Sequence, residues 1–339
     1  MRKTLLALLL LTSAAVQAQV QLKDGHPDNY TVVKGDTLWD ISGKFLSKPW
    51  KWPEIWHANP QVANPHLIYP GDRLSLVYID GQPRIMLDRG ESRGTIKLSP
   101  KVRSTPMAEA IPTIPLEAIN SFLLSNRIMN TAAEFADGPY VVAGNAERVV
   151  SGAGDRIYVR GEVEDDAIYG IFRQGRTYVD PDTEEFLGIN ADDIGAGEIV
   201  AVEDEIGTMV LTRTTQEVRI ADRLFPTEER AINSTFLPSE PKETINGLIL
   251  DVPRGVSQIG QFDVVTINKG ARDGLEIGNV LAVYKTGETV RDRLNGDSVK
   301  IPDERAGLLM IFRTYDKLSY GLVLYASRQL SVLDKVKNP

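Results

Sequence analysis

One stretch of the chain, Tyr30 to Leu76, carries strand and helix signals so closely spaced that it predicts a single small folding unit. Tyr30 to Val33 is a run of large and β-branched residues, which favours a strand. Thr37 to Asp40 has the form of a capping box, in which a hydroxyl and a later carboxylate satisfy the free N–H groups that begin a helix. Leu74 to Tyr78 predicts the strand that returns.

Two helices are predicted between these strands. Leu38, Ile41 and Phe45 fall on one face of the first helix, as in an amphipathic helix that packs on a core. Pro53 stands where the first residue of a second helix would be, and that helix continues through Trp56. The sequence therefore predicts a β-α-α-β unit.

Two segments of this unit, YTVVKGDTLWDI at 30–41 and NPHLIYPGDRL at 64–74, resemble the LysM family. Members of that family bind glycans that contain N-acetylglucosamine, such as peptidoglycan and chitin. The segment SKPWKWP at 47–53 departs from the family pattern, because it is longer and richer in Trp. The resemblance implies a LysM module at residues 19–82, and it covers only about residues 29–77.

The resemblance also implies where a glycan would bind. One wall of the groove would be Gly35, Asp36, Thr37 and Leu38, and the other would be Asn64, Pro65, His66, Leu67 and Ile68. N-acetylglucosamine is neutral, so its recognition needs backbone N–H and C=O groups together with an apolar floor.

All four Trp of the chain lie in the predicted module. Trp39 and Trp56 occupy helix positions that are predicted to face the core. Trp50 and Trp52 stand in the extra loop, where we predict that they are exposed. Either they contact the sugar through their ring faces, or they have no role in binding.

The first 18 residues have the pattern of a secretory signal peptide. Arg2 and Lys3 are followed by an apolar run, and small residues precede the cleavage that we expect after Ala18. The alternative is an N-terminal anchor that is retained. The chain resembles secreted proteins of Gram-negative bacteria that have an N-terminal LysM module rich in aromatic residues, so we expect this protein to be located in the periplasm. No later stretch is apolar for long enough to span a membrane.

The middle of the chain is acidic. Residues 134–229 contain 8 basic and 22 acidic residues, which argues against nucleic-acid binding. A solvated surface explains this charge, with a site for a cation or a basic partner as the alternative. Acidic groups such as the one at 180–185 lack the spacing of a calcium-binding loop.

The rest of the chain predicts short strands, and the fold class that follows is α+β multidomain. A connector with one helix at 83–139 would precede two duplicated, mainly β domains, barrel-like or sandwich, at 140–229 and 240–339. Residues 168–180 align with 280–292 at an offset of 112, and Asp222 aligns with Asp334 at the same offset. Gly197 aligns with Gly307 only after an adjustment of two residues. The alternative to duplication is that similar patterns of strands and turns recur by chance.

The sequence contains no catalytic motif that we recognise. The three histidines, His26, His57 and His66, lack the spacing of zinc ligands, and the absence of cysteine excludes a thiol nucleophile and any disulfide. We therefore expect no enzyme activity, no metal and no cofactor.

The predicted function is non-catalytic binding of peptidoglycan in the cell envelope, with the LysM module as the anchor. The β-domains would bind another envelope protein or a second copy of the chain. Two alternatives remain open at this point. The β-region is a peptidoglycan-remodelling enzyme, or the chain is a structural adaptor of an envelope assembly.

Overall fold

The computed structural model describes residues 20–56, 68–88, 112–115, 118–119, 127–144, 150–227, 236–253 and 258–339. The predicted signal peptide lies outside these ranges. The chain divides into two compact units, within residues 1–111 and 112–339. In the ranges described, the structure contains no apolar helix of the length that a bilayer crossing requires.

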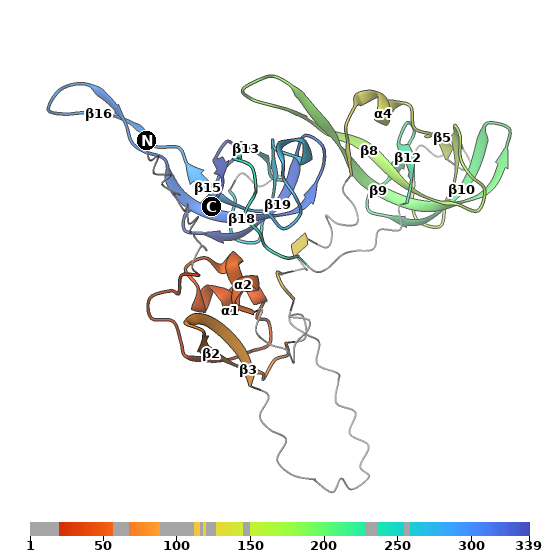
Figure 1. The fold of residues 1–339 in the computed structure, drawn as a ribbon. Helices are drawn as coiled ribbons and strands as arrows, with labels where there is room; N and C mark the ends of the chain where they lie inside the picture. Colours follow the sequence, from red (N-terminus) through yellow and green to blue (C-terminus); the bar gives the residue numbers. More distant parts are fainter. Residues whose placement is uncertain are drawn as a thin grey trace, which may run out of the picture. The chain divides into compact units, whose positions relative to one another are not determined.

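The first unit contains the predicted β-α-α-β order and one further strand (Figure 1). Its elements are β1 (Asn29–Thr31), α1 (Leu38–Phe45), the 3₁₀ helix η1 (Pro49–Lys51), α2 (Trp52–Trp56), β2 (Arg73–Ile79) and β3 (Gln82–Asp88). The strands form one antiparallel sheet in the order β1-β2-β3. Helix α2 begins one residue before Pro53, and β3 extends past residue 82.

The additional strand β3 follows a two-residue turn. Asp80 and Gly81 both have positive φ, 51° and 75°, which is the geometry of a tight hairpin turn of the type that Asp-Gly favours. This dipeptide was the sequence signal for β3, which runs from the end of the predicted module into the segment that we predicted as a connector.

The core of the first unit is apolar and includes both helices. The predicted inward face of α1 is confirmed, because Leu38, Ile41 and Phe45 are each at most 1% exposed. They belong to a buried cluster with Val32, Leu46, Trp52, Ile55, Trp56, Ile68, Leu74 and Ile85.

The second unit is almost entirely β, so the α+β label fits only the first unit. Its first part contains β4 (Arg127–Met129), α4 (Ala132–Ala136), β5 (Tyr140–Gly144), β6 (Val150–Ser151), β7 (Arg156–Arg160), β8 (Ile168–Val179), β9 (Phe186–Glu203), β10 (Ile206–Thr214), β11 (Val218–Arg219) and β12 (Arg223–Pro226). Six of these strands pair in the order β10-β7-β5-β12-β8-β9, and β9 also pairs with β10. We call this closed ring barrel 1. Strand β4, in the segment predicted as a connector, pairs with β9.

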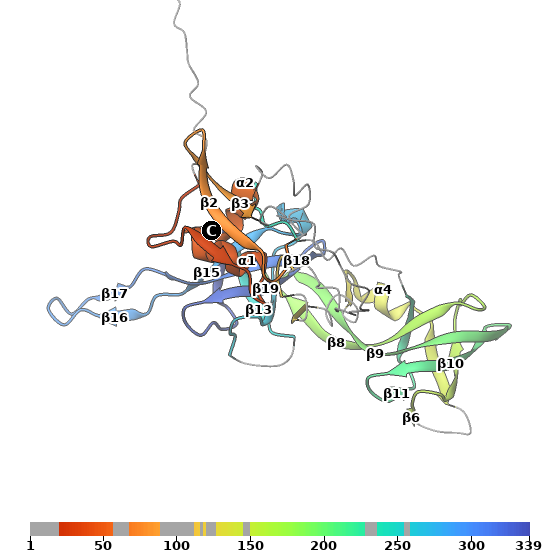
Figure 2. The same cartoon turned by 90° about the horizontal axis from the view of Figure 1, so that it is seen from below.

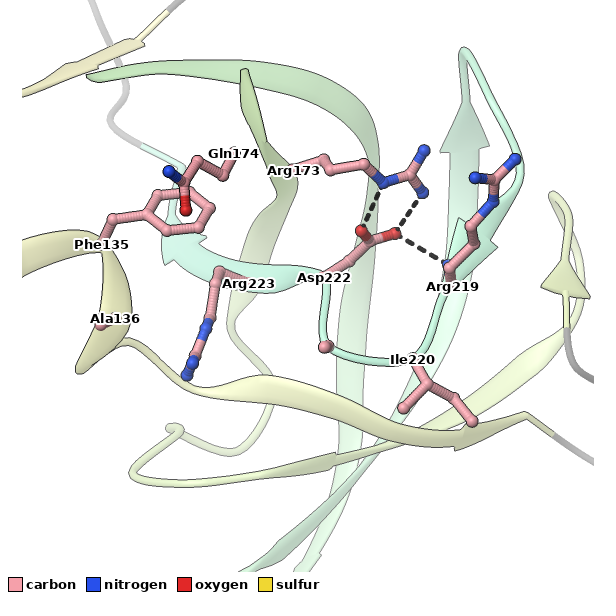
Figure 3. A pocket seen from close by; sticks show the side chains of 9 residues that line it. Phe135, Ala136, Arg173, Gln174, Arg219, Ile220, Asp222 and Arg223 are labelled. Atoms are coloured by element: carbon pink, nitrogen blue, oxygen red, sulfur yellow. Dashed lines mark hydrogen bonds and ion pairs between the residues drawn. The ribbon is translucent and has the colours of Figure 1, made fainter. Parts of the chain in front are cut away.

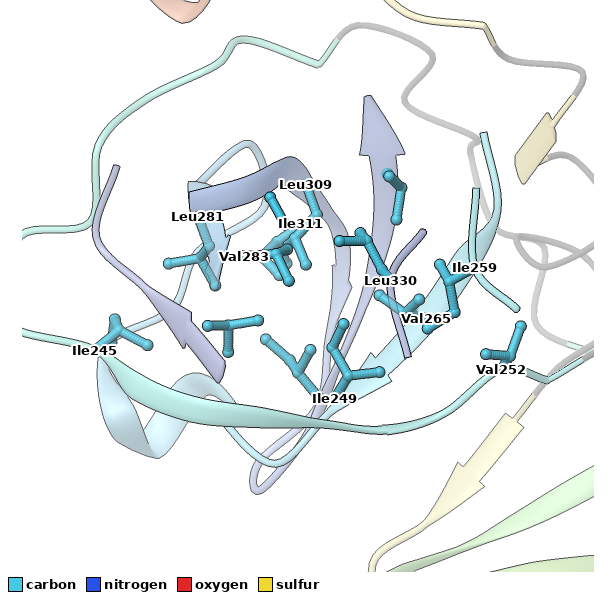
Figure 4. Packing of buried hydrophobic residues seen from close by; sticks show 14 of the residues in the cluster. Ile245, Ile249, Val252, Ile259, Val265, Leu281, Val283, Leu309, Ile311 and Leu330 are labelled. Carbon is cyan, nitrogen blue, oxygen red and sulfur yellow. The ribbon is translucent and has the colours of Figure 1, made fainter. Parts of the chain in front are cut away.

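The second part is a closed six-stranded barrel, which we call barrel 2 (Figures 1 and 2). Its six strands are β13 (Asn246–Asp251), β14 (Val264–Ile267), β15 (Val280–Lys285), β18 (Glu304–Thr314), β19 (Ser319–Ala326) and β20 (Lys335–Lys337). The same part of the chain also contains the 3₁₀ helix η3 (Ala271–Asp273) and a separate two-stranded sheet of β16 (Thr289–Arg291) and β17 (Ser298–Lys300). Figure 4 shows the interior of barrel 2, where aliphatic residues such as Ile249, Leu281 and Leu309 meet from facing strands. Leu275, in the loop before β15, is also buried in this cluster.

The two barrels have the same strand order. Barrel 2 is ordered β19-β14-β13-β20-β15-β18, which repeats barrel 1 strand for strand. The pairs also recur at an offset of 112, because Ile168 pairs with Glu198 and Val280 with Met310. A bulge follows Ile171 in β8, and one follows Val283, its equivalent in β15.

The structure corrects one detail of the alignment. Gly195 pairs with Ile171, and Gly307 pairs with Val283, so Gly195 is the equivalent of Gly307 without any adjustment. A Cβ on either glycine would lie under 3.0 Å from a backbone oxygen of the neighbouring strand. The prediction that Gly197 is the equivalent of Gly307 was therefore wrong.

A turn before the last strand of each barrel was predicted from Asp222 and Asp334, and it is present in both. Each carboxylate accepts a hydrogen bond of 2.8 Å from the backbone N–H three residues earlier. The residues just before them, Ala221 and Leu333, have φ of 72° and 70°. A buried aspartate thus holds the same strained turn twice.

We predict that replacing Leu309 by Ala destabilises barrel 2 by about 2–5 kcal/mol, because a fully buried side chain leaves a cavity. Urea unfolding followed by far-ultraviolet circular dichroism measures this change. Leu294→Ala is the matched control, because Leu294 is 95% exposed and its loss should change the free energy of unfolding by less than about 0.5 kcal/mol. Equal effects of the two substitutions would contradict the packing described.

Candidate functional site

The first wall of the predicted groove is the turn that leads into α1. Gly35 is exposed, with φ of +98°, and a Cβ there would meet no atom within 4 Å. The Asp36 side chain holds the turn together, because its Oδ2 atom accepts hydrogen bonds of 2.9 Å from the Val33 N–H and from the Tyr30 hydroxyl. The wall therefore presents an open stretch of backbone at Gly35.

Thr37 and Leu38 complete this wall, but their side chains face inward. The predicted capping box is confirmed, because the Thr37 hydroxyl accepts from the Asp40 N–H at 3.1 Å and donates to Asp40 Oδ2 at 2.7 Å. Thr37 is 4% exposed and Leu38 is 1% exposed. These two residues can face a ligand only through their backbone.

The second wall is described only at its end. Asn64, Pro65, His66 and Leu67 lie outside the described residues. Ile68 is fully buried, in the same apolar cluster as Leu38.

Backbone hydrogen bonds tie the two sides together. Val32 donates to the Asp72 carbonyl at 2.9 Å and accepts from Gly71 at 2.8 Å, so the segment before the first wall is paired with the turn after the second.

The structure overturns the prediction that Trp50 and Trp52 are exposed. Trp50 is 2% exposed and Trp52 is 1% exposed, so neither offers a ring face on which a sugar could stack. Trp52 belongs to the module core, where its large apolar area is removed from water. The Lys48 ammonium lies 5.5 Å from the centre of the Trp50 ring. Trp39 and Trp56 are buried as predicted.

Residues 30–77 match the family model of the LysM domain. These residues are a LysM domain. The chain is also similar to the uncharacterized protein YqbP of Bacillus subtilis (strain 168), with 42% identity over 60 residues. That match covers 15% of this chain and 27% of YqbP.

At the level of the family, a LysM domain binds glycans of the peptidoglycan and chitin type, and this domain has suitable chemistry. Its described wall offers backbone groups at Gly35, and the charged side chain in that wall, Asp36, is already hydrogen-bonded within the turn. A neutral acetylated sugar needs such groups.

A second candidate site is a pocket of about 320 Å³ in barrel 1 (Figure 3). The Arg173 guanidinium donates to both carboxylate oxygens of Asp222, at 2.8 and 2.7 Å, and Arg223 donates to the Gly138 carbonyl. Lys285 forms the equivalent ion pair with Asp334 in barrel 2, at 3.1 Å. The ion pair of Arg173 and Asp222 therefore holds the turn that both barrels share.

No group of three or more His, Cys, Asp or Glu side chains in the described ranges is placed to hold a metal ion.

We predict that Thr37→Ala lowers the stability of the LysM domain by about 1 kcal/mol, because the cap of α1 is lost. All four Trp lie in this domain, so unfolding followed by Trp fluorescence reports on it alone. Thr37→Ser keeps the hydroxyl and should unfold as the unmodified chain does. A loss of the same size in both variants would mean that the hydroxyl is not the stabilising group.

Alkaline pH should also destabilise this domain. Burial and the hydrogen bond to Asp36 raise the pKa of the Tyr30 hydroxyl to about 12. The folded domain thus holds this proton more tightly than the unfolded chain, so the contribution is complete below about pH 10 and is lost as the pH rises through 12. Tyr30→Phe should remove this part of the pH dependence of unfolding. An unchanged pH dependence in that variant would exclude Tyr30 as its source.

Proposed function

We propose that this chain is an exported, non-catalytic protein of the cell envelope that binds peptidoglycan through its LysM domain. The observation that carries the proposal is the LysM match at residues 30–77, together with the open backbone at Gly35. Export to the periplasm rests on the signal-peptide pattern of the first 18 residues. The LysM domain would hold the two barrels at the wall.

The absence of catalysis is part of this proposal. The chain has no cysteine, and in the polar pocket of barrel 1 Arg173 and Asp222 hold a turn. The alternative, an enzyme that cleaves peptidoglycan, predicts soluble fragments when the protein is incubated with purified cell-wall sacculi. We expect that none are released.

We infer in addition that the two barrels are copies of one β-unit. Identical strand order, identical register and bulges at equivalent positions support duplication over chance resemblance of strands. The repeated aspartate turn supports it as well.

Glycan binding is tested by a substitution that fills the open space at the groove. Gly35→Asn places a side chain beside the first wall, so we expect the dissociation constant for sacculi or chitin oligosaccharides to rise about tenfold or more, which is about 1.4 kcal/mol. Gly81→Asn is the matched control, because Gly81 also has positive φ and open space but lies in the β2–β3 turn. Pull-down of the full chain with sacculi measures the binding.

Equal binding by both variants would contradict the placement of the groove at Gly35. Failure of the unmodified chain to bind sacculi would contradict the proposed function itself. Trp fluorescence of each variant establishes that the LysM domain remains folded.

A further inference from the structure

Each barrel carries a long hairpin that continues past the ring of strands. Arm 1, residues 174–192, consists of the end of β8, the following turn and the start of β9. Arm 2, residues 286–304, runs from the end of β15 to the first residue of β18 and contains β16 and β17. The two arms are equivalent at the offset of 112. Arm 2 projects away from barrel 2 (Figure 2).

Arm 1 is docked on barrel 2 within the same chain. The Tyr178 hydroxyl donates to Asp251 at 3.2 Å, and Asn268 donates to Asp180 at 2.7 Å. Glu185, at the tip, accepts two hydrogen bonds from the Arg272 guanidinium, at 2.6 and 2.7 Å.

Two further contacts hold arm 1 on barrel 2. The Lys317 ammonium lies 2.9 Å from Glu185, and the Tyr320 hydroxyl donates to Asn190 at 3.2 Å. The basic groups lower the pKa of Glu185 to about 2, Arg272 more than Lys317. The acidic group at 180–185 is therefore partly an internal docking surface rather than only a solvated one.

Arm 2 repeats the apolar residues of arm 1 but leaves them uncovered. Tyr178, Leu187 and Ile189 of arm 1 are 3%, 1% and 3% exposed. Their equivalents Val290, Val299 and Ile301 are 38%, 48% and 40% exposed. A two-stranded hairpin with open edges and an apolar face is only marginally stable in water unless another element covers it.

Barrel 1 has the matching uncovered face. On barrel 2, Thr266, Phe312 and Leu318 lie at the outer face and are at most 1% exposed. Their equivalents on barrel 1 are Tyr158, Val200 and Ile206, which are 37%, 45% and 36% exposed. The positions correspond by register, since Asp251 pairs with Thr266 and Ala143 pairs with Tyr158.

We propose that arm 2 of one copy of the chain docks on this face of barrel 1 of a second copy, as arm 1 docks on barrel 2. Within each chain arm 1 already covers the face of barrel 2, so arm 2 and the face of barrel 1 remain uncovered. Such a contact is heterologous, and it generates open, head-to-tail chains of molecules. The proposal rests on the equivalence of the barrels and not on glycan binding.

Charges make this contact weaker than the internal one. The equivalent positions place Asp292 opposite Arg160, which is favourable. They also place Asp297 opposite Glu205, which pairs with Arg160 at 3.0 Å, where the internal contact has Glu185 opposite Lys317. Salt screens such like-charge repulsion, so we expect the association to strengthen as ionic strength rises.

The test uses single cysteines, because the chain has none of its own. Val290→Cys in the arm and Tyr158→Cys on the face are made in separate full-length chains, mixed, and treated with a short bismaleimide cross-linker. We expect a cross-linked dimer in the mixture and little in either variant alone. A chain that carries both cysteines should give a ladder of oligomers that grows with salt.

Val290→Cys mixed with Ile220→Cys is the matched control, since Ile220 is 55% exposed on barrel 1 but lies in the β11–β12 turn. Dimers of Val290→Cys with itself would show that two arms pair symmetrically, which overturns the proposal. Absence of the mixed dimer at high protein and salt concentration also overturns it. In either case sacculus binding by the LysM domain is unaffected.

Discussion

The register between neighbouring strands is the constraint on which both barrels depend. In a closed barrel the side chains alternate between interior and exterior, so a slip of one residue would move every aliphatic residue of a strand out of the core. The chain has no disulfide to hold a register, so burial of residues such as Leu309 and Ile311, together with the turns, specifies it. Equivalent bulges after Ile171 and Val283 show that the same solution is used twice.

The LysM domain follows a different principle, in which a small core is completed by aromatic side chains. Trp52 and Trp56 fill space between two short helices and a three-stranded sheet. Because these rings are used for stability, the described wall can offer a ligand mainly backbone at Gly35. This arrangement agrees with recognition of a neutral sugar, which needs hydrogen bonds rather than charge.

The two arms connect architecture with assembly. Arm 1 converts two barrels into one body through a mixture of apolar burial and paired charges, with Glu185 between Arg272 and Lys317. A single LysM domain is expected to bury little surface on a glycan and to bind it with modest affinity, and several such domains in one assembly would bind a wall with much higher avidity. Self-association through arm 2 would supply that avidity.

Much of the first unit could be predicted from local patterns. The capping box at Thr37, the apolar face of α1 and the returning strand each depend on a few neighbouring residues, and each was found. Strand β3 was not predicted, although the dipeptide Asp80-Gly81 is typical of the hairpin turn that precedes it. The aspartate turns at Asp222 and Asp334 were also local, and the constant spacing between them indicated the equivalence of the two β-regions.

The sequence by itself determined the elements whose causes lie within a few residues, namely helix caps, turns and alternating strands, and it determined the LysM pattern. Only the tertiary structure decided that Trp50 and Trp52 are buried, that Gly195 rather than Gly197 corresponds to Gly307, and that arm 1 is covered while arm 2 is free. Burial, strand pairing and docking depend on residues far apart in the chain. No local pattern reports which of those distant groups will meet.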